Sequence, residues 1–197
     1  MYTWGYIKDA ALAKLDLDQD EANEMRLINR FPFYANEVIT QVCSAIKPKH
    51  CYYEITITPD KLNKLQTIDD KMFIAFGDDV CTIEYEDEFG TRWLDECHDD
   101  ILEYKGYNSF ICRQVGIYRI SYKARWITFD NSTPSSEVLD VPADILECIP
   151  SYIAHQCYKI DDEYKSSVFR NEYEMFLSRI DDTHFKMNKT FKIGGDW

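Results

Sequence analysis

The sequence predicts an α+β protein: a helical bundle from the N- and C-terminal segments, an inserted antiparallel β-sandwich or barrel-like domain, and an extended C-terminal tail. Apolar residues recur at steps of three and four within residues 1–49 and 138–183, a period typical of amphipathic helices. Residues 50–137 instead contain short runs rich in β-branched and aromatic residues, separated by Gly, Asp and Asn. Residues 184–197 lack a helical period, and we expect an extended docking tail there. The simplest topology inserts the β segment between helices that pack together.

The N-terminal segment predicts a short helix followed by a longer one. Trp4, Ile7, Ala11 and Leu15 lie at helical spacing. A longer apolar stripe follows, made of Leu27, Ile28, Phe31, Tyr34, Val38, Ile39, Val42 and Ile46. The stripe keeps its phase across Pro32, which predicts either a helix kinked at this proline or two helices nearly in line.

The β segment predicts several short strands. Its runs are "CYYEITIT", "KMFIAFG", "VCTIEYED", "TRWLDE", "ILEYKGYNSFICR" and "GIYRISYKARWITF". Strands at this rhythm favour a small antiparallel sandwich or barrel. The aromatic residues could line a sugar-binding face or fill the core and rim of the sandwich, as strand aromatics ordinarily do. They are Tyr52, Tyr53, Phe73, Phe76, Tyr85, Trp93, Tyr104, Tyr107, Phe110, Tyr118, Tyr122, Trp126 and Phe129.

The C-terminal segment predicts further helices. Pro142 and Pro150 each fit a first helical position. The expected inward stripe of the first stretch is Ile149, Ile153, Cys157 and Ile160. The expected inward residues of the last helix are Tyr164, Val168, Phe169, Tyr173, Phe176, Leu177 and Ile180.

Two acidic pairs frame the last predicted helix. Asp161 or Asp162 is expected to cap its start, because Asp accepts hydrogen bonds from the first backbone N–H groups. Asp181 and Asp182 are expected to end it, because negative charge is unfavourable at a helix C-terminus. This interpretation makes the pairs helix boundaries rather than a metal site.

The charge of the chain limits the class of protein. It has 22 basic and 35 acidic residues, a net charge of −13. Proteins that read nucleic-acid sequence need a basic footprint, so this balance disfavours that class. Residues 50–137 form the most acidic part. The acidic stretches at 77–79 and 84–88 lack the spacing of a calcium-binding EF-hand and fit solvated turns or strand ends.

Cysteine usage and the N-terminus predict a protein kept in a reducing cytoplasm. Seven cysteines without a CxxC pair match neither a zinc module nor a secretory disulfide framework. The N-terminus has no basic region followed by an apolar core, as a secretory signal has. No apolar run approaches the roughly 20 residues of a membrane span. We therefore expect no membrane association, cofactor or metal.

Candidate catalytic pairs are weak. Cys97 and His98 are adjacent in a predicted strand, so their side chains point to opposite faces. His155 and Cys157 are two residues apart on a predicted helix and also diverge. We expect no enzymatic activity; a metal-dependent or Cys–His hydrolase is the alternative that metal analysis would test.

The tail has an apolar alternation. Phe185, Met187, Phe191 and Ile193 share one face of an extended strand, and Trp197 ends the chain. Such a pattern favours strand addition to another protein. The competing interpretation is a tail folded back on its own core.

Two parts of the sequence resemble a known family. Residues 138–182 contain Pro-x-Tyr-Ile-Ala-x-Gln, an acidic pair and an Arg-Asn-Glu-Tyr-Glu helix. In this they resemble the C-terminal helices of head–tail connector (adaptor) proteins of tailed bacteriophages. The stretch "LINRFPFYANEVITQVCSAIKP" is similar to the long helix of such connectors in phages of Gram-positive hosts. The likeness covers about half of the chain; the β segment departs from the minimal all-helical adaptor, although larger members carry such an insertion.

The resemblance implies a structural virion protein of the neck. It implies a homo-oligomeric ring, a dodecamer, that docks on the portal protein, extends the DNA channel and supports downstream neck or tail proteins. Assembly would take place in the host bacterial cytoplasm. In that family the C-terminal segment reaches the portal, which makes Phe185, Met187, Phe191, Ile193 and Trp197 the docking candidates. An acidic channel wall would let the genome pass without adhering. The alternative is a carbohydrate-binding or adhesion module carried by the β segment.

Overall fold

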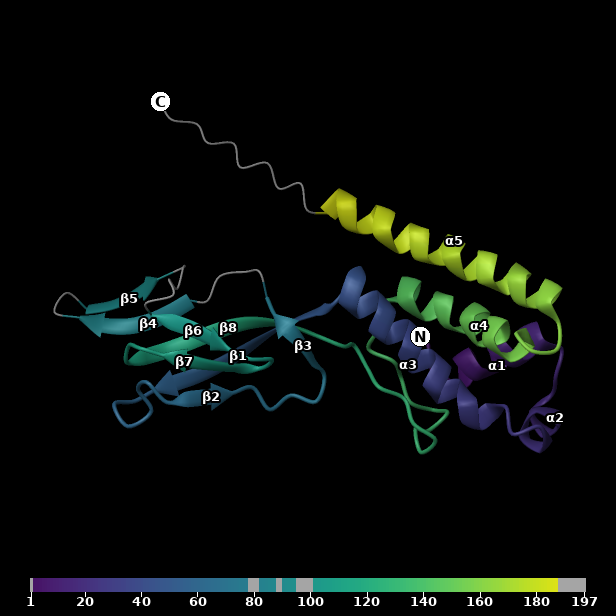
Figure 1. Cartoon of the computed structure of the whole chain (residues 1–197), viewed down its shortest axis with the longest axis horizontal. Helices are drawn as coiled ribbons and strands as arrows, with labels where there is room; N and C mark the ends of the chain where they lie inside the picture. Colours follow the sequence, from purple (N-terminus) through teal and green to yellow (C-terminus); the bar gives the residue numbers. More distant parts are fainter. Residues whose placement is uncertain (1, 78–81, 88–89, 95–100, 188–197) are drawn as a thin grey trace, which may run out of the picture. The chain divides into compact units, whose positions relative to one another are not determined.

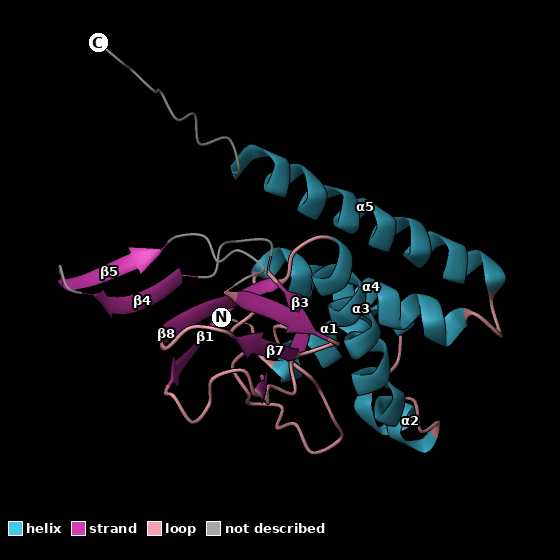
Figure 2. Ribbon diagram, turned by 60° about the vertical axis from the view of Figure 1, so that its left-hand side comes forward, coloured by secondary structure: helices cyan, strands magenta, loops and turns pink. Residues whose placement is uncertain are grey.

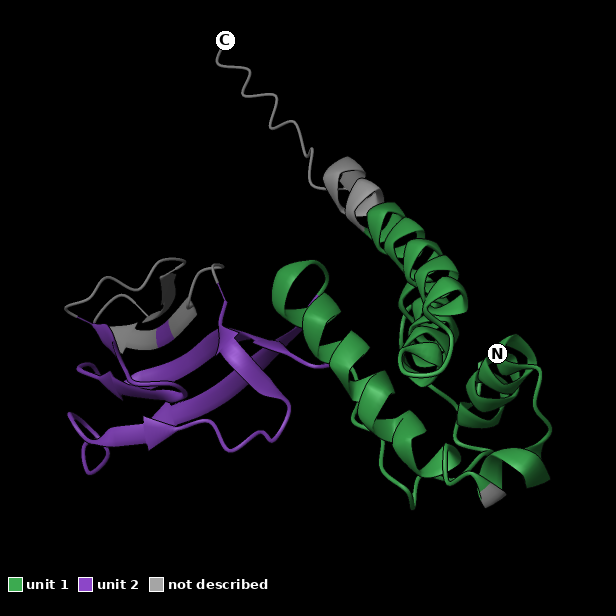
Figure 3. Cartoon of the chain, turned by 45° about the vertical axis from the view of Figure 1, so that its right-hand side comes forward, with its two compact units in different colours: residues 1–47, 126–197 green, residues 48–125 purple. Residues whose placement is uncertain are grey.

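The computed structural model has two compact units, a helical unit from residues 1–47 and 126–197 and a β unit from residues 48–125 (Figure 3). The fold is α+β, as predicted: helices from both ends of the chain pack together, and antiparallel sheets are inserted between them. The structure describes residues 2–77, 82–87, 90–94 and 101–187.

Helix α4 is the centre of the helical unit, because α1, α3 and α5 all pack against it (Figure 1). The α-helices are α1 (Trp4–Leu15), α2 (Gln19–Glu24), α3 (Phe31–Ala45), α4 (Ala143–Tyr158) and α5 (Glu163–Met187), with a 3-10 turn η1 (Ile28–Arg30). The core contains fully buried side chains from four of these helices: Trp4, Ile7, Phe31, Val38, Ile39, Val42, Ile145, Leu146, Ile149, Ile153 and Ile180. Burying their apolar surface is the main stabilisation of this unit.

Three prolines of the helical unit occupy different kinds of position. Pro32 lies in the first turn of α3, directly after η1, so the predicted stripe belongs to two successive elements rather than to one kinked helix. Pro142 directly precedes the first residue of α4, one position before the place predicted for it. The prediction for Pro150 was wrong, because this proline lies inside α4. Buried Ile149 and Ile153 hold the helix against its neighbours on both sides of the proline, which offsets the missing backbone hydrogen bond.

Helix α5 is longer than predicted and presents a different face to the core. Its backbone stays helical past Asp181 and Asp182 to Met187, so the predicted end of the helix at the acidic pair was wrong. Residues 184–187 of the predicted tail belong to this helix, and the rest of that tail lies outside the described residues. No Gly or Pro interrupts residues 163–187, and the helix dipole opposes negative charge only within the last turn. The acidic pair lies more than one turn before the end of the helix, where that repulsion is weak.

The face of α5 that contacts the core includes Tyr173 and Ile180, as predicted, but not Tyr164 or Val168, which are exposed. Tyr164 and Tyr173 are nine residues apart, which at about 100° per residue places them on opposite sides of the helix. Ser166 takes the inward position near the start of α5 and is buried. Ile160, expected in the inward stripe before this helix, is also exposed.

A long connection between the β unit and α4 belongs to the helical unit, not to the β segment where the sequence placed residues 126–137. The Asn36 side chain holds it through two hydrogen bonds of 2.8 Å, one to the carbonyl oxygen and one from the N–H of Phe129. The Phe129 ring stacks on Trp4 at a centroid distance of 4.3 Å. Gly5 N donates to Ser135 O at 2.8 Å, a close approach for which glycine is needed, because a Cβ there would lie 2.8 Å from the same oxygen.

The β unit contains two antiparallel sheets (Figure 2). In the larger sheet, β8 is central: β1 pairs along its whole length on one edge, while β3 and β4 pair with different halves of the other edge. The smaller sheet has the order β2-β7-β6. The strands are β1 (Lys49–Ile57), β2 (Leu65–Thr67), β3 (Phe73–Phe76), β4 (Thr82–Asp87), β5 (Gly90–Leu94), β6 (Leu102–Lys105), β7 (Ser109–Cys112) and β8 (Gly116–Ala124).

The core of the β unit is aromatic, as its sequence indicates. The run "ILEYKGYNSFICR" forms a hairpin of β6 and β7, which turns at Gly106 with a φ of 77°. Phe73 and Tyr122 stack at 5.5 Å, and the Tyr122 hydroxyl donates to Asp70 at 2.7 Å. The buried members of this core include Ile57, Ile68, Phe73, Leu102, Phe110, Tyr118, Ile120 and Tyr122.

Candidate docking surfaces of the helical unit

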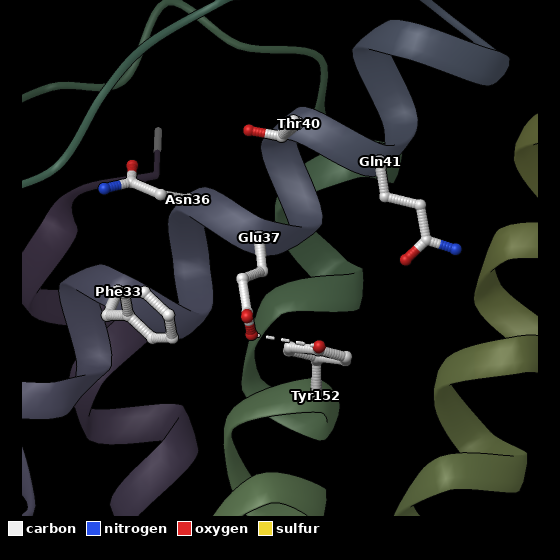
Figure 4. A pocket seen from close by; sticks show the side chains of 6 residues that line it. All are labelled: Phe33, Asn36, Glu37, Thr40, Gln41 and Tyr152. Atoms are coloured by element: carbon white, nitrogen blue, oxygen red, sulfur yellow. Dashed lines mark hydrogen bonds between the residues drawn. The ribbon is translucent and has the colours of Figure 1, made fainter.

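An open groove of about 440 Å³ lies on the surface of the helical unit (Figure 4). Helix α3 supplies most of it, because side chains three and four residues apart project from one side of a helix. The lining residues are Phe33, Asn36, Glu37, Thr40 and Gln41 from α3 and Tyr152 from α4. This combination of an exposed aromatic ring, a carboxylate and amides can bind a partner side chain.

Two tyrosine hydroxyls join the groove to the neighbouring helices. Tyr152 donates to Glu37 Oε2 at 3.0 Å, and Tyr173 of α5 donates to Gln41 Oε1 at 2.8 Å. The two rings lie 4.9 Å apart. Burial, followed by the hydrogen bond to Glu37, raises the pKa of Tyr152, and burial raises the pKa of Tyr173. Both hydroxyls therefore stay protonated and keep donating at neutral pH.

Glu37 is an acceptor that the described part of the chain leaves without a cation. No lysine, arginine or histidine of the described residues forms an ion pair with it. The Phe33 ring lies one helical turn before Glu37 and is 62% exposed. A carboxylate beside an exposed aromatic ring suits a basic side chain, which gains both an ion pair and a cation–π contact.

Helix α5 carries an apolar face that points away from the core. Tyr164 is 78% exposed, Val168 46% and Met175 45%. The steps of four and seven residues place the three side chains along one side of the helix. The sequence interpretation missed this outward face, because it assigned Tyr164 and Val168 to the inward stripe and gave Met175 no role. The angular position of each residue around the helix could have revealed this face. At about 100° per residue, the predicted inward set spans too wide an angle to lie on one side.

Arg179 lies beside this face and pairs with no carboxylate of the described side chains. The Arg179 guanidinium lies 3.8 Å from Met175 Sδ and 5.6 Å from the ring centroid of Phe176. The other arginine of α5, Arg170, forms an ion pair with Glu174 at 2.9 Å. The Arg179 side chain is exposed, and no carboxylate of the described side chains pairs with it.

The residues predicted from sequence as functional have mixed positions. Asp162 accepts a hydrogen bond of 2.9 Å from the N–H of Lys165 and so caps α5, whereas Asp161 is exposed. The backbones of Phe185 and Met187 lie in the last turns of α5. Phe191, Ile193 and Trp197 lie outside the described residues, as do Cys97, His98, residues 78–79 of the first acidic stretch and Glu88 of the second.

The His155 side chain contacts α5, and burial changes the pKa of the Cys148 and Cys157 thiols. Ser166 Oγ lies 2.9 Å from Nδ1 of His155 and donates to the His155 carbonyl at 3.2 Å, which ties α4 to α5. Burial raises the pKa of the Cys157 thiol to about 11, and burial with nearby Asp144 raises that of Cys148 to about 12. Both thiols are therefore protonated at neutral pH, in which state they are poor nucleophiles.

Within the described ranges, no group of three or more metal-ligating side chains comes together. None of the described helices is long and apolar enough to cross a membrane. No protein-family model matches this chain, and comparison with curated proteins finds no match. The surfaces above are therefore interpreted from their own chemistry.

Proposed function

We propose that this chain is a structural head–tail connector (adaptor) protein of a tailed bacteriophage. In this proposal it docks as a ring on the portal protein, extends the DNA channel and supports attachment of neck or tail proteins. The observation that carries the proposal is the packing of α3 and α5 on α4, because these helices contain the two stretches that resemble such connectors. The net charge of −13 also suits a channel wall that does not retain DNA.

Co-purification with the portal protein of the same phage genome tests the proposal. The full chain should be retained by the tagged portal, and a variant ending at Met187 should be lost from it, because the apolar tail residues Phe191, Ile193 and Trp197 are the proposed contacts. The variant Ile160→Ser is a matched control, since it removes an exposed apolar side chain elsewhere. Equal retention of the shortened and full chains would refute docking through the tail, and no retention of either would refute the function.

Affinity for duplex DNA gives a second test. A protein that lines a channel should bind DNA negligibly at moderate salt, because its acidic surface repels phosphate. Tight, salt-sensitive binding in a gel-shift assay would contradict the proposal.

A second candidate, a carbohydrate-binding or adhesion module, is supported by exposed tyrosines of the β unit. Tyr52 is 53% exposed, Tyr104 44% and Tyr107 66%. The Tyr104 ring lies 4.3 Å from that of Phe76, which gives an aromatic surface of the kind on which sugar rings can stack. A glycan array probed with the full chain separates the two functions, because a connector should give no signal there.

A further inference from the structure

We propose that the outward apolar face of α5 in one copy of this chain packs into the α3–α4 groove of a second copy, with Arg179 paired to Glu37. The inference deepens the proposed function by assigning the contact between ring subunits, and it rests on that function for closure of the ring.

The outward face of α5 exposes apolar surface that a partner can bury. Tyr164, Val168 and Met175 expose large apolar side chains along one side of a single helix. Scattered apolar residues are normal on a protein surface, but a row at helical spacing, opposite the buried face of the same helix, is the arrangement of a helix that packs on two sides.

The groove offers two aromatic rings, those of Phe33 and Tyr152, to an apolar partner surface. Phe33 is more than half exposed, and the Tyr152 ring is fixed by its hydrogen bond to Glu37. An amphipathic helix in such a groove places side chains at steps of three, four and seven residues, as the α5 face does.

Charge complementarity selects a second copy as the occupant. Among the described residues, no ion pair joins Glu37 to a cation or Arg179 to a carboxylate, whereas two lysines of this unit are paired. Lys14 pairs with Glu172 at 2.8 Å and Lys47 with Asp144 at 2.6 Å. Arg179 borders the apolar face, and Glu37 lies in the groove. One contact between two copies would therefore pair both charges and cover both apolar surfaces.

The two surfaces are different, so the contact is heterologous. An open chain of copies keeps a free α5 face at one end and a free groove at the other. Such contacts therefore produce a closed ring or an open filament rather than an isolated dimer. A face-to-face pairing of two α5 helices would instead stop at a dimer.

Sedimentation velocity of the full chain with two variants tests the contact. The variant Val168→Glu places a charge in the face but leaves the groove intact, whereas Glu37→Lys alters the groove but leaves the face intact. Both residues are at least partly exposed, so the fold should survive, which circular dichroism checks. Wild type should self-associate in a concentration-dependent way, and each variant alone should lose about tenfold or more in association constant.

Mixing the two variants gives the decisive result. One intact groove meets one intact face, so an equimolar mixture should form a heterodimer and stop there. The double variant Glu37→Arg with Arg179→Glu should recover association, because it exchanges the two charges. Glu54→Lys is the matched control, an exposed charge reversal on β1 that should associate as wild type does.

Three outcomes would overturn the inference: wild type that stays monomeric at every concentration reached, self-association of Glu37→Lys at wild-type strength, or a mixture that forms no heterodimer. The proposed function fails separately. A wild type that is monomeric yet retained by the portal keeps the connector function and refutes this contact. A chain that associates through both surfaces but is not retained by the portal keeps this contact and refutes the connector function.

Discussion

Asn36 is the residue whose loss should most clearly disturb the helical unit without removing apolar surface. Its side chain lies in α3 and satisfies both backbone groups of Phe129, which is 2% exposed. Replacing it with alanine leaves one N–H and one carbonyl oxygen without their partner. The connection from the β unit to α4 would then lose the contact that fixes it against α3.

The expected loss follows from the two orphaned groups. Each unsatisfied buried backbone group costs about 1–3 kcal/mol, and alanine recovers less than about 1 kcal/mol through its higher helix propensity. We therefore expect Asn36→Ala to lower the free energy of unfolding by about 1–6 kcal/mol. The effect should extend to the N-terminus, because Trp4 stacks on Phe129 and Gly5 donates to Ser135 of the same connection.

Urea unfolding measures the global effect, and hydrogen exchange at the Gly5 amide measures the local one. Exchange at this amide should accelerate by about tenfold or more, since 1.4 kcal/mol corresponds to a factor of ten in an opening equilibrium. Asn23→Ala, at an exposed position in α2, is the control and should change stability by less than about 0.5 kcal/mol. An Asn36→Ala variant as stable as this control, with unchanged Gly5 exchange, would refute the reasoning.

Three further perturbations test other parts of the structure. Gly5→Ala should destabilise the protein by about 1–3 kcal/mol in urea unfolding, because its Cβ would crowd Ser135 O; unchanged stability would show that the connection can move aside. Ser166→Ala should cost about 1 kcal/mol by removing the α4–α5 hydrogen bonds at His155, whereas Ser167→Ala, on the exposed side, should not. The folded pKa of the Cys157 thiol, about 11, lies above its ordinary value of 9, so the unfolded chain releases this proton first and stability should fall as the pH rises from about 9 to about 11. Cys157→Ala should reduce that fall, and an unchanged pH profile would contradict it.

The apolar periodicity of α3 was sufficient to predict its buried side. Phe31, Val38, Ile39 and Val42 are fully buried, as expected from their spacing. This prediction succeeded because a helix with one apolar side has one way to bury it. The short β-branched and aromatic runs of the β segment likewise predicted antiparallel strands. They could not specify that β3 and β4 share one edge of β8, because such pairings depend on contacts far apart in the sequence.

Helix α5 shows where periodicity is insufficient. Tyr164 and Val168 are as apolar as Tyr173, so only the angle between them, not their type, separates the outward face from the inward one. The end of α5 was also predicted wrongly. Asp181 and Asp182 disfavour a helix only within its last turn, and the helix continues beyond them to Met187. The groove could not be predicted at all, because Tyr152 meets Glu37 only after α4 packs on α3.

The discontinuity of the helical unit has a consequence for the order in which a ribosome delivers its parts. Helix α3 ends at Ala45, and its central partner α4 begins only at Ala143, about 100 residues later. At roughly 5–20 residues per second, the apolar sides of α1 and α3 would wait about 5–20 s before α4 emerges to cover them. The whole β unit is synthesised during that interval and can fold first. The nascent chain would thus pass through a stage in which the β unit is folded while the apolar sides of α1 and α3 are still exposed. A chaperone that binds apolar surface would act mainly at this stage.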